Sequence, residues 1–307
     1  YMLLINNSTI NCDRDMHCEI DCIEENCSNR IIVGGNATMM TVNCEYCSES
    51  VIECPNIGEC NVNCLNEESC KNVSIHAINT TQKLTIKCSS HQHSCAYMNV
   101  DADSHIIYMV IGNNSVNDVF EEGKELILES SVDSNIYVNC INPYSCQNII
   151  INAKEAQLIE LNGESLYSLN EAIIFGNSSN TILTRCRESS CNNMMIYSQS
   201  VSELIVNAFG MNGIMNSSIF CQNCESININ CHETTNNTGS CNSVSIFFPT
   251  NGNNSIINCY GNGCQNNDTI GIYSENGMKD VSLNYYDDMC SCIDLESCFG
   301  NVDIFCG

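Results

Sequence analysis

The chain has 307 residues, with 36 acidic against 10 basic side chains and a formal net charge of −26. That charge repels nucleic acid and anionic lipid, so we expect no nucleic-acid partner. The longest apolar runs, such as 106–111, have about six residues and are too short for a membrane span. The 26 cysteines approach the content of a disulfide scaffold and indicate an oxidising, extracellular compartment, with secretion or cell-surface display.

A cysteine phrase recurs along the chain, and the strand-like segment before its first cysteine always has the same form. Residues two apart share one face of a strand, so each cysteine is expected to point with the preceding aliphatic residue, at the edge of a core. The segments are Val42-Asn43-Cys44, Val62-Asn63-Cys64, Val138-Asn139-Cys140, Ile229-Asn230-Cys231 and Ile257-Asn258-Cys259.

The segment after the second cysteine is also regular. In Cys146-Gln147-Asn148-Ile149-Ile150-Ile151-Asn152-Ala153, one face is small or aliphatic and the other is polar or mixed. This alternation predicts a strand with one face in a core. The same frame fits 70–77, 95–102, 191–198 and 241–248.

The spacing of the phrase predicts the architecture. Cys22, Cys44, Cys64 and Cys88 follow one another at roughly 20 to 24 residues, a repeat length typical of stacked solenoid coils. The later intervals to Cys140, Cys186 and Cys231 are each close to two units, which predicts coils without a cysteine pair near 112–113, 162–163 and 210–213. We therefore expect an all-β, disulfide-rich parallel β-helix of about twelve coils, with 1–307 as one domain that is either complete or part of a longer chain. A β-sandwich also has many short strands, but it does not explain the repeated phrase.

Successive coils of a β-helix bring equivalent residues together. Asn29, Asn72, Asn148 and Asn193 are expected to form an internal asparagine ladder beside the cysteines. Pairing within one turn, as Cys140 with Cys146, is the simple hypothesis, and bonds between adjacent coils remain the alternative. The expected disulfide cysteines are Cys12, Cys18, Cys22, Cys27, Cys64, Cys70, Cys88, Cys95, Cys140, Cys146, Cys186, Cys191, Cys231, Cys241, Cys259, Cys264, Cys292 and Cys298.

The coil pattern resembles the pectin-lyase-like right-handed parallel β-helix superfamily. The Cys-turn-Ser-Cys-x-Asn phrase is similar to that of uncharacterised, cysteine-rich extracellular proteins of single-celled eukaryotes. Galacturonase-type members of the superfamily have N-T-D, D-D, G-H-G and R-I-K motifs, of which this chain has only Asp287-Asp288. Lyase-type members combine calcium-binding acids with a basic residue, and no such basic cluster is present here. Polysaccharide cleavage is therefore the weakest hypothesis, and we expect no catalytic residues and no cofactor.

Sequons for N-glycosylation are frequent, and several follow the end of an apolar strand. Asn36, Asn79, Asn113, Asn177 and Asn253 share this position, which predicts a common outward corner opposite the cysteines. Asn72 also begins a sequon, but as a ladder residue it is expected to stay bare. The expected glycosylation sites are Asn36, Asn79, Asn113, Asn177, Asn216, Asn236, Asn253 and Asn267.

Metal sites are not expected. His91 and His93 lack an obvious third ligand, and Asp101 with Asp103 is more typical of plain surface charge than of a calcium site. The C-x2-C pairs Cys44/Cys47 and Cys221/Cys224 suggest either a zinc knuckle or disulfides. Disulfides are favoured because these pairs align with the other cysteine turns in a shortened form.

Apolar strand-like sequence begins at once in 1–10, and the pattern continues to 302–307 without polar caps. Either identical copies stack head to tail, or caps lie on a longer chain. The sequence thus favours a structural subunit of an extracellular glycosylated filament, appendage or coat, whose partners are further copies of itself and its N-glycans. A cell-surface adhesin or carbohydrate-binding module is the alternative. An exposed aromatic strip would favour it, and the only adjacent aromatic pairs are Phe247-Phe248 and Tyr285-Tyr286.

Overall fold

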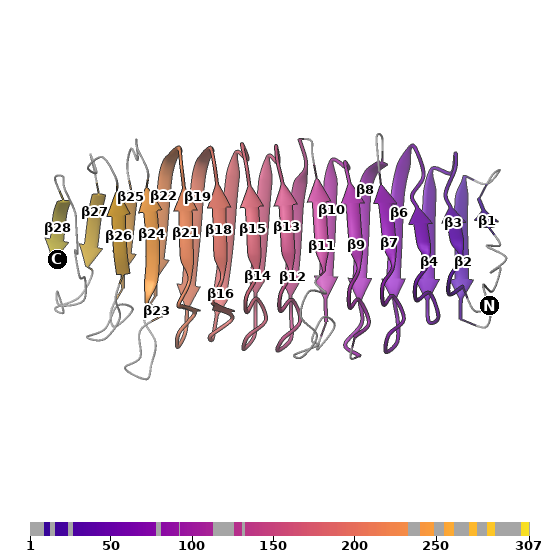
Figure 1. Ribbon diagram of the computed structural model, residues 1–307, viewed down its shortest axis with the longest axis horizontal. Coiled ribbons are helices and arrows are strands. Elements are labelled where there is room, and N and C mark those ends of the chain that lie inside the picture. The colour runs from indigo at the N-terminus through magenta and orange to yellow at the C-terminus, as the bar shows by residue number, and fades with distance from the viewer. Residues whose placement is uncertain are drawn as a thin grey trace, which may run out of the picture.

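The computed structural model is a parallel β-solenoid whose coils follow one another along a single long axis (Figure 1). It describes residues 9–12, 16–23, 27–77, 81–91, 93–112, 126–130, 133–232, 240–248, 255–260, 270–274, 281–285 and 302–306. All assigned elements are strands, and every pairing between them is parallel. No helix in these ranges has the length and apolar character that a membrane crossing requires.

Sheet A is the first of two long walls and contains 12 strands. Its members, in order along the axis, are β1 (Thr9–Asn11), β3 (Ile31–Val33), β5 (Val51–Glu53), β7 (Ser74–Ala77), β9 (Asn99–Ala102), β11 (Ile127–Ser130), β13 (Ile150–Ala153), β15 (Ile173–Gly176), β18 (Met195–Ser198), β21 (Ser218–Cys221), β24 (Val244–Phe248) and β26 (Ile270–Ser274).

Sheet B is the second wall and contains 13 strands. They are β2 (His17–Cys22), β4 (Met39–Cys44), β6 (Gly58–Cys64), β8 (Thr81–Cys88), β10 (Ile106–Ile111), β12 (Asn135–Cys140), β14 (Leu158–Gly163), β16 (Thr181–Arg187), β19 (Val201–Phe209), β22 (Cys224–Cys231), β25 (Ser255–Cys259), β27 (Val281–Tyr285) and β28 (Val302–Cys306). A third, short sheet joins β17 (Cys191–Asn192), β20 (Ile214–Met215) and β23 (Cys241–Asn242).

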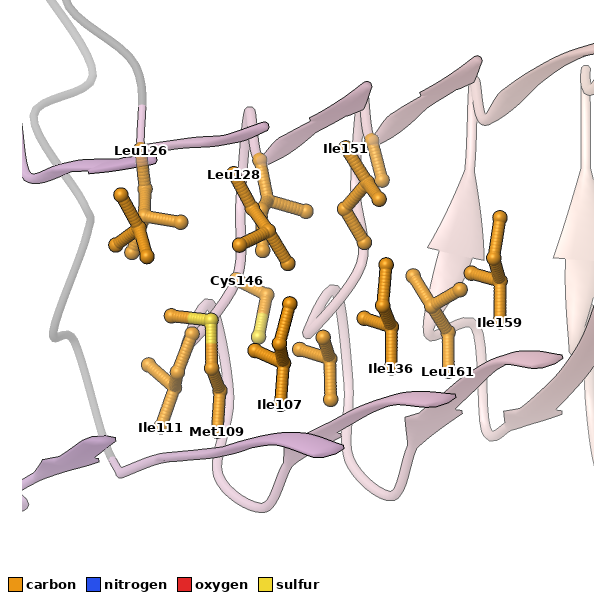
Figure 2. Packing of buried hydrophobic residues seen from close by; sticks show 14 of the residues in the cluster. Ile107, Met109, Ile111, Leu126, Leu128, Ile136, Cys146, Ile151, Ile159 and Leu161 are labelled. Atoms are coloured by element: carbon orange, nitrogen blue, oxygen red, sulfur yellow. The ribbon is translucent and has the colours of Figure 1, made fainter. Parts of the chain in front are cut away.

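The core lies between the two walls, as the alternating sequence predicts. Most strands whose side chains are described bury every second one, and the pattern in β4 and β12 is strictly alternate. Figure 2 shows Leu128 and Ile151 from sheet A facing Ile136 and Leu161 from sheet B, with Cys146 beside them. The core is therefore a narrow apolar column that continues from coil to coil.

In sheet A, the register aligns one inward-facing residue of each strand with an inward-facing residue of the next strand. This residue is almost always isoleucine. Aliphatic side chains stacked at the strand spacing keep their contacts in every coil, and the β-branched shape suits a pleated surface. The column is Ile10, Ile32, Ile52, Ile75, Val100, Leu128, Ile151, Ile174, Ile196, Ile219 and Ile246.

The coils without a cysteine pair are where the spacing predicts them. The register aligns Ile111 with Cys88 and Cys140, and it aligns Gly163 with Cys140 and Cys186. Ala208 similarly lies between Cys186 and Cys231. These residues take the inward position that cysteine holds in the neighbouring coils, so the cysteine column is interrupted without any change of register.

Candidate functional site

Disulfides concentrate at the corner where sheet B ends and the chain turns back toward sheet A. The first cysteine lies at or next to the end of a sheet B strand, and the second lies 3 to 10 residues later in the same coil, with Cα atoms 5.4 to 5.8 Å apart. The pairs are Cys22–Cys27, Cys44–Cys47, Cys64–Cys70, Cys88–Cys95, Cys140–Cys146, Cys186–Cys191 and Cys231–Cys241. Each bond closes one turn.

Three further disulfides lie at the opposite corner, between a sheet A strand and the following sheet B strand. They are Cys12–Cys18, Cys54–Cys60 and Cys221–Cys224. The expectation of one cysteine corner was wrong, and Cys221/Cys224 is not a shortened form of the main turn. Cys221 ends β21 of sheet A, so its bond closes a different bend.

The remaining expected disulfide residues are not tested. Cys264, Cys292 and Cys298 lie outside the described residues, and the side chain of Cys259 in β25 does too.

The internal asparagine ladder was a wrong prediction. Asn29, Asn72 and Asn193 are exposed and Asn148 is half-buried, at the outer side of the turns. All four have φ between 54° and 60°, the left-handed region that asparagine tolerates better than most side chains. Asparagine is thus present for its backbone conformation, and the reason given for leaving Asn72 bare no longer holds.

An amide ladder does exist, on the outer face of sheet B. Its members are the asparagines that directly precede the cysteine column, so neighbouring coils bring them together. Asn63 Nδ2 donates to Asn43 Oδ1 at 2.8 Å, and Asn162 Nδ2 donates to Asn139 Oδ1 at 2.7 Å. The same donation, from each coil to the one before it, joins Asn207, Asn230, Asn258 and Asn284 at 2.7 to 2.9 Å.

The ladder continues through charged groups where asparagine is replaced. Asn43 Nδ2 donates to Asp21 Oδ1 at 2.7 Å, and Arg185 donates both to Asn162 Oδ1 at 2.9 Å and to Glu160. A ladder of this kind satisfies side-chain amides along the axis and adds a second set of hydrogen bonds beside the backbone pairing. The repeated asparagine of the Val-Asn-Cys segments indicates this ladder, although we used these segments only to place the cysteine.

An aromatic column runs along the outer face of sheet A in the C-terminal half. Phe175, Tyr197, Phe220 and Phe247 are consecutive partners in the register. Their ring centroids are 5.2, 4.8 and 4.5 Å apart, with interplanar angles of 14°, 5° and 5°. Each half-buried ring therefore covers a face of its neighbour and presents mainly its edge outward.

A second stack follows the cysteine column. His232 lies between Phe209 and Tyr260, with centroid distances of 4.3 and 4.8 Å. Burial lowers the pKa of His232 below its ordinary value, because a partly desolvated imidazole disfavours the charged form. The imidazole is thus stabilised as a neutral ring in an aromatic stack.

The histidines and acids that sequence reasoning singled out do not form a metal centre in the described part of the chain. His91 is exposed and its Nδ1 lies 3.2 Å from Ser89 Oγ. Asp101 faces outward on sheet A, with Oδ2 at 3.8 Å from His76 Nδ1. Asp287-Asp288 and Tyr286 lie outside the described residues, as does the side chain of Tyr285.

Groups of three potential metal ligands within 4.8 Å of one another occur twice among the described residues, and both consist of cysteines. All of these cysteines are in disulfides, which lack the thiolate that binds metals. The groups are Cys22, Cys27 and Cys47, and Cys64, Cys88 and Cys95.

The expected glycosylation sites within the described residues fall at two places. Asn36 and Asn177 lie in turns that follow sheet A strands β3 and β15, at the corner opposite the main cysteine column. Asn216 is exposed and lies between β20 and β21, so it belongs to a different bend. Asn79, Asn113, Asn236, Asn253 and Asn267 lie outside the described residues.

No protein-family model, no curated protein and no solved structure matches the chain. The likeness to parallel β-helix proteins therefore rests on the architecture, which identifies the class of protein as a disulfide-rich parallel β-solenoid.

Proposed function

We propose that this chain is a structural subunit of an extracellular, N-glycosylated filament, surface appendage or coat, in which copies contact one another end to end. The supporting observation is the continuous parallel pairing of sheet B from β2 to β28, with a register shift between Gly58 and Glu59. Every interior strand of such a sheet offers the same donor and acceptor pattern to the coil on either side. A strand of a second copy that met this pattern would pair as a further coil does, and repeated head-to-tail contacts give open filaments.

The chemistry of the walls supports a mechanical role. The amide ladder, the aromatic column and the isoleucine column all join neighbouring coils along the axis. The disulfides, in contrast, hold each turn in shape. A solenoid reinforced in both ways is suited to bearing load or spacing other molecules outside the cell.

The compartment follows from the same bonds. Ten disulfides among the described residues indicate an oxidising, extracellular-type environment. We propose that the chain is secreted and that Asn36, Asn177 and Asn216 carry glycans, as do the sequons outside the described residues. Asn36 and Asn216 are exposed and Asn177 is half-buried, so an attached glycan would extend from a corner of the rod.

A second candidate function, a cell-surface adhesin or carbohydrate-binding module, would need an exposed aromatic strip, and the aromatic column on sheet A is the candidate for one. Saccharides bind aromatic side chains mainly through the ring face, because sugar C–H groups pack against it. Here the faces of Tyr197 and Phe220 cover one another at 4.8 Å, so an incoming saccharide would meet ring edges. This geometry favours the structural role over the binding role.

The experiment is electron microscopy of the protein purified from its source without reducing agent. We expect continuous rods whose axial repeat matches the length of one chain or a simple multiple of it. Discrete single particles at all accessible concentrations would reject the end-to-end assembly. Retention on immobilised glycans by such particles would then favour the adhesin.

A further inference from the structure

A polar groove lies at the corner where sheet A strands pass into sheet B strands, outside the columns described above. It extends over four successive coils and has a volume of about 520 Å³, within the range of small-ligand sites. Its lining includes Asp133, Glu155, Gln157, Ser178, Ser179 and Asn180.

The chemistry of this groove fits a neutral ligand rich in hydroxyl and amide groups. Asp133 and Glu155 supply carboxylate oxygens that accept hydrogen bonds and repel anions. Gln157 and Asn180 can both donate and accept through their amides, and the Gln157 amide is already oriented by donating to Asp133 Oδ1 at 2.9 Å. This combination of acceptors and two-way amides is suited to the N-acetylated sugars with which N-linked glycans begin.

A buried hydroxyl in the groove supports the same conclusion. Ser179 is only 2% exposed, and its Oγ has no hydrogen-bond partner among the described residues. Five other described hydroxyls are also buried without a partner, those of Ser69, Thr85, Ser145, Ser168 and Thr184, and Ser179 is the member of this set that lines the groove. Rotation about χ1 moves Oγ to another staggered position, and a polar ligand in the groove would supply the missing partner.

The groove directly adjoins a sequon. Asn177 precedes Ser178 and Ser179, both of which line the groove, and Ser178 has a φ of 58° that fixes the turn in left-handed geometry. A glycan on Asn177 would therefore be held next to the groove by its own covalent bond. Tethering raises the local concentration of the first sugars and allows a shallow site to be filled without high intrinsic affinity.

We propose that this groove is the binding site for the first N-acetylhexosamine units of a glycan on Asn177, so that this glycan lies along the rod. The inference depends on the glycosylation included in the proposed function. Asn36 provides an internal reference, because it follows a sheet A strand at the same corner but is absent from the lining of this groove.

The experiment uses the full chain secreted from a eukaryotic host that attaches N-glycans. Glycopeptide mass spectrometry gives the occupancy of each site, and timed digestion with an amidase that releases N-glycans gives the release rate in native and denatured protein. One additional hydrogen bond to the sugars slows release about fivefold. Folding should therefore lower the release rate at Asn177 about fivefold more than it lowers the rate at Asn36.

Two variants test the groove itself without altering the sequon. Ser200 is exposed and lines the groove, so Ser200→Arg should fill it and bring the Asn177 release rate to that of Asn36. Glu155→Gln, also at an exposed position, should have a smaller effect in the same direction. Glu53→Gln, on the outer face of sheet A away from the groove, is the matched control and should leave the rate unchanged.

The possible results test binding of the glycan in the groove separately from glycosylation of Asn177. If Asn177 is glycosylated and its glycan is released as readily as that of Asn36, the groove does not bind the glycan, and the proposed glycosylation stands. If Asn177 is bare while Asn36 is glycosylated, both the binding in the groove and the assignment of Asn177 as a glycosylation site are wrong. Slow release that persists in Ser200→Arg would also contradict the groove as the cause.

Discussion

Two described parts of the rod, an N-terminal half of residues 9–112 and a C-terminal half of residues 126–248, are reinforced differently. Residues 9–112 contain six disulfides, whereas residues 126–248 contain four. The same outer column of sheet A also changes character, from Glu53, His76, Asp101 and Glu129 to the stacked rings of Phe175, Tyr197 and Phe220. Covalent closure of single turns and aromatic stacking between turns therefore serve as alternative ways to stabilise a narrow solenoid.

The difference is clearest in the coils that lack a cysteine pair at the main corner. The Gly163 coil contributes Tyr167, whose ring lies 5.4 Å from that of Tyr144 in the preceding, disulfide-bonded coil. The Ala208 coil contributes Phe209, which stacks on His232. In both cases a coil without a disulfide at the main corner is joined by an aromatic stack to a neighbour that has one there.

Reduction should produce the largest effect and should separate the halves. A closed turn of this length contributes about 2 kcal/mol, so six bonds amount to about 12 kcal/mol and four to about 8 kcal/mol as upper bounds. Total stabilities of domains are about 5 to 15 kcal/mol, so the N-terminal half should lose most of its protection. Amide hydrogen exchange with and without reductant measures this, and we expect a larger loss in 27–112 than in 133–232. Equal losses would contradict compensation by the aromatic stacks.

The second prediction concerns the space at an unclosed coil. A Cβ at Gly163 would lie 2.7 Å from Ser190 Oγ and 3.0 Å from Leu169 Cδ1, so Gly163→Ala should destabilise by about 2 kcal/mol through overpacking. Urea unfolding followed by circular dichroism is the measurement. Ala208→Gly, in the same column, removes a methyl group and should cost only about 1 kcal/mol. A neutral Gly163→Ala would mean that the corner relaxes easily and that steric fit did not select glycine.

The third prediction weakens the aromatic column. Tyr197→Ala removes two ring contacts, each contributing about 0.5 to 1.5 kcal/mol, so the free energy of unfolding should fall by about 1 to 3 kcal/mol. Asp101→Ala changes the same column in the other half. It should alter stability by less than about 0.5 kcal/mol, because its pairing with His76 is solvent-exposed. Equal effects of the two variants would remove the distinction between the halves.

The smallest effect is a pH dependence confined to the C-terminal half. The pKa of His232 is lower in the folded chain than the unfolded value of 6.5, because burial disfavours the imidazolium. Below pH 6.5 the unfolded state binds more protons than the folded state, so folding stability falls as the pH falls. The stability associated with the neutral imidazole is fully present above pH 6.5 and is lost as the pH falls through the folded pKa. His232→Phe keeps a ring in the stack without titrating. The difference in unfolding midpoint between wild type and His232→Phe should change between pH 7 and pH 5, and a constant difference would reject the assignment.

The sequence was sufficient for the parts of the structure that depend on period two. Alternation predicted the buried faces of β4, β12 and β13, and cysteine spacing predicted the coils with Ile111, Gly163 and Ala208 at the inward position. Both predictions depend on which residues point into the core, and the order of residues along one chain is sufficient to show this.

The outer columns were harder to predict because they depend on the register between coils of unequal length. Phe175, Tyr197, Phe220 and Phe247 are separated by 22, 23 and 27 residues, so they show no fixed period. The four asparagines after the second cysteine were interpreted by their side chains, whereas their left-handed φ values explain them. Corner geometry and inter-coil register are thus the information that alternation alone does not contain.

Disulfide mapping of the secreted, unreduced protein tests the account most directly. The sulfur atoms of Cys64, Cys88 and Cys95 lie within 4.8 Å of one another, so bonds between coils are a real alternative. Digestion without reduction, followed by mass spectrometry, should recover Cys64–Cys70, Cys88–Cys95 and Cys140–Cys146, all within one turn. Recovery of Cys64 bonded to Cys88 or Cys95 would contradict this account. Neighbouring coils would then be joined by covalent bonds rather than by strand pairing and side-chain stacking.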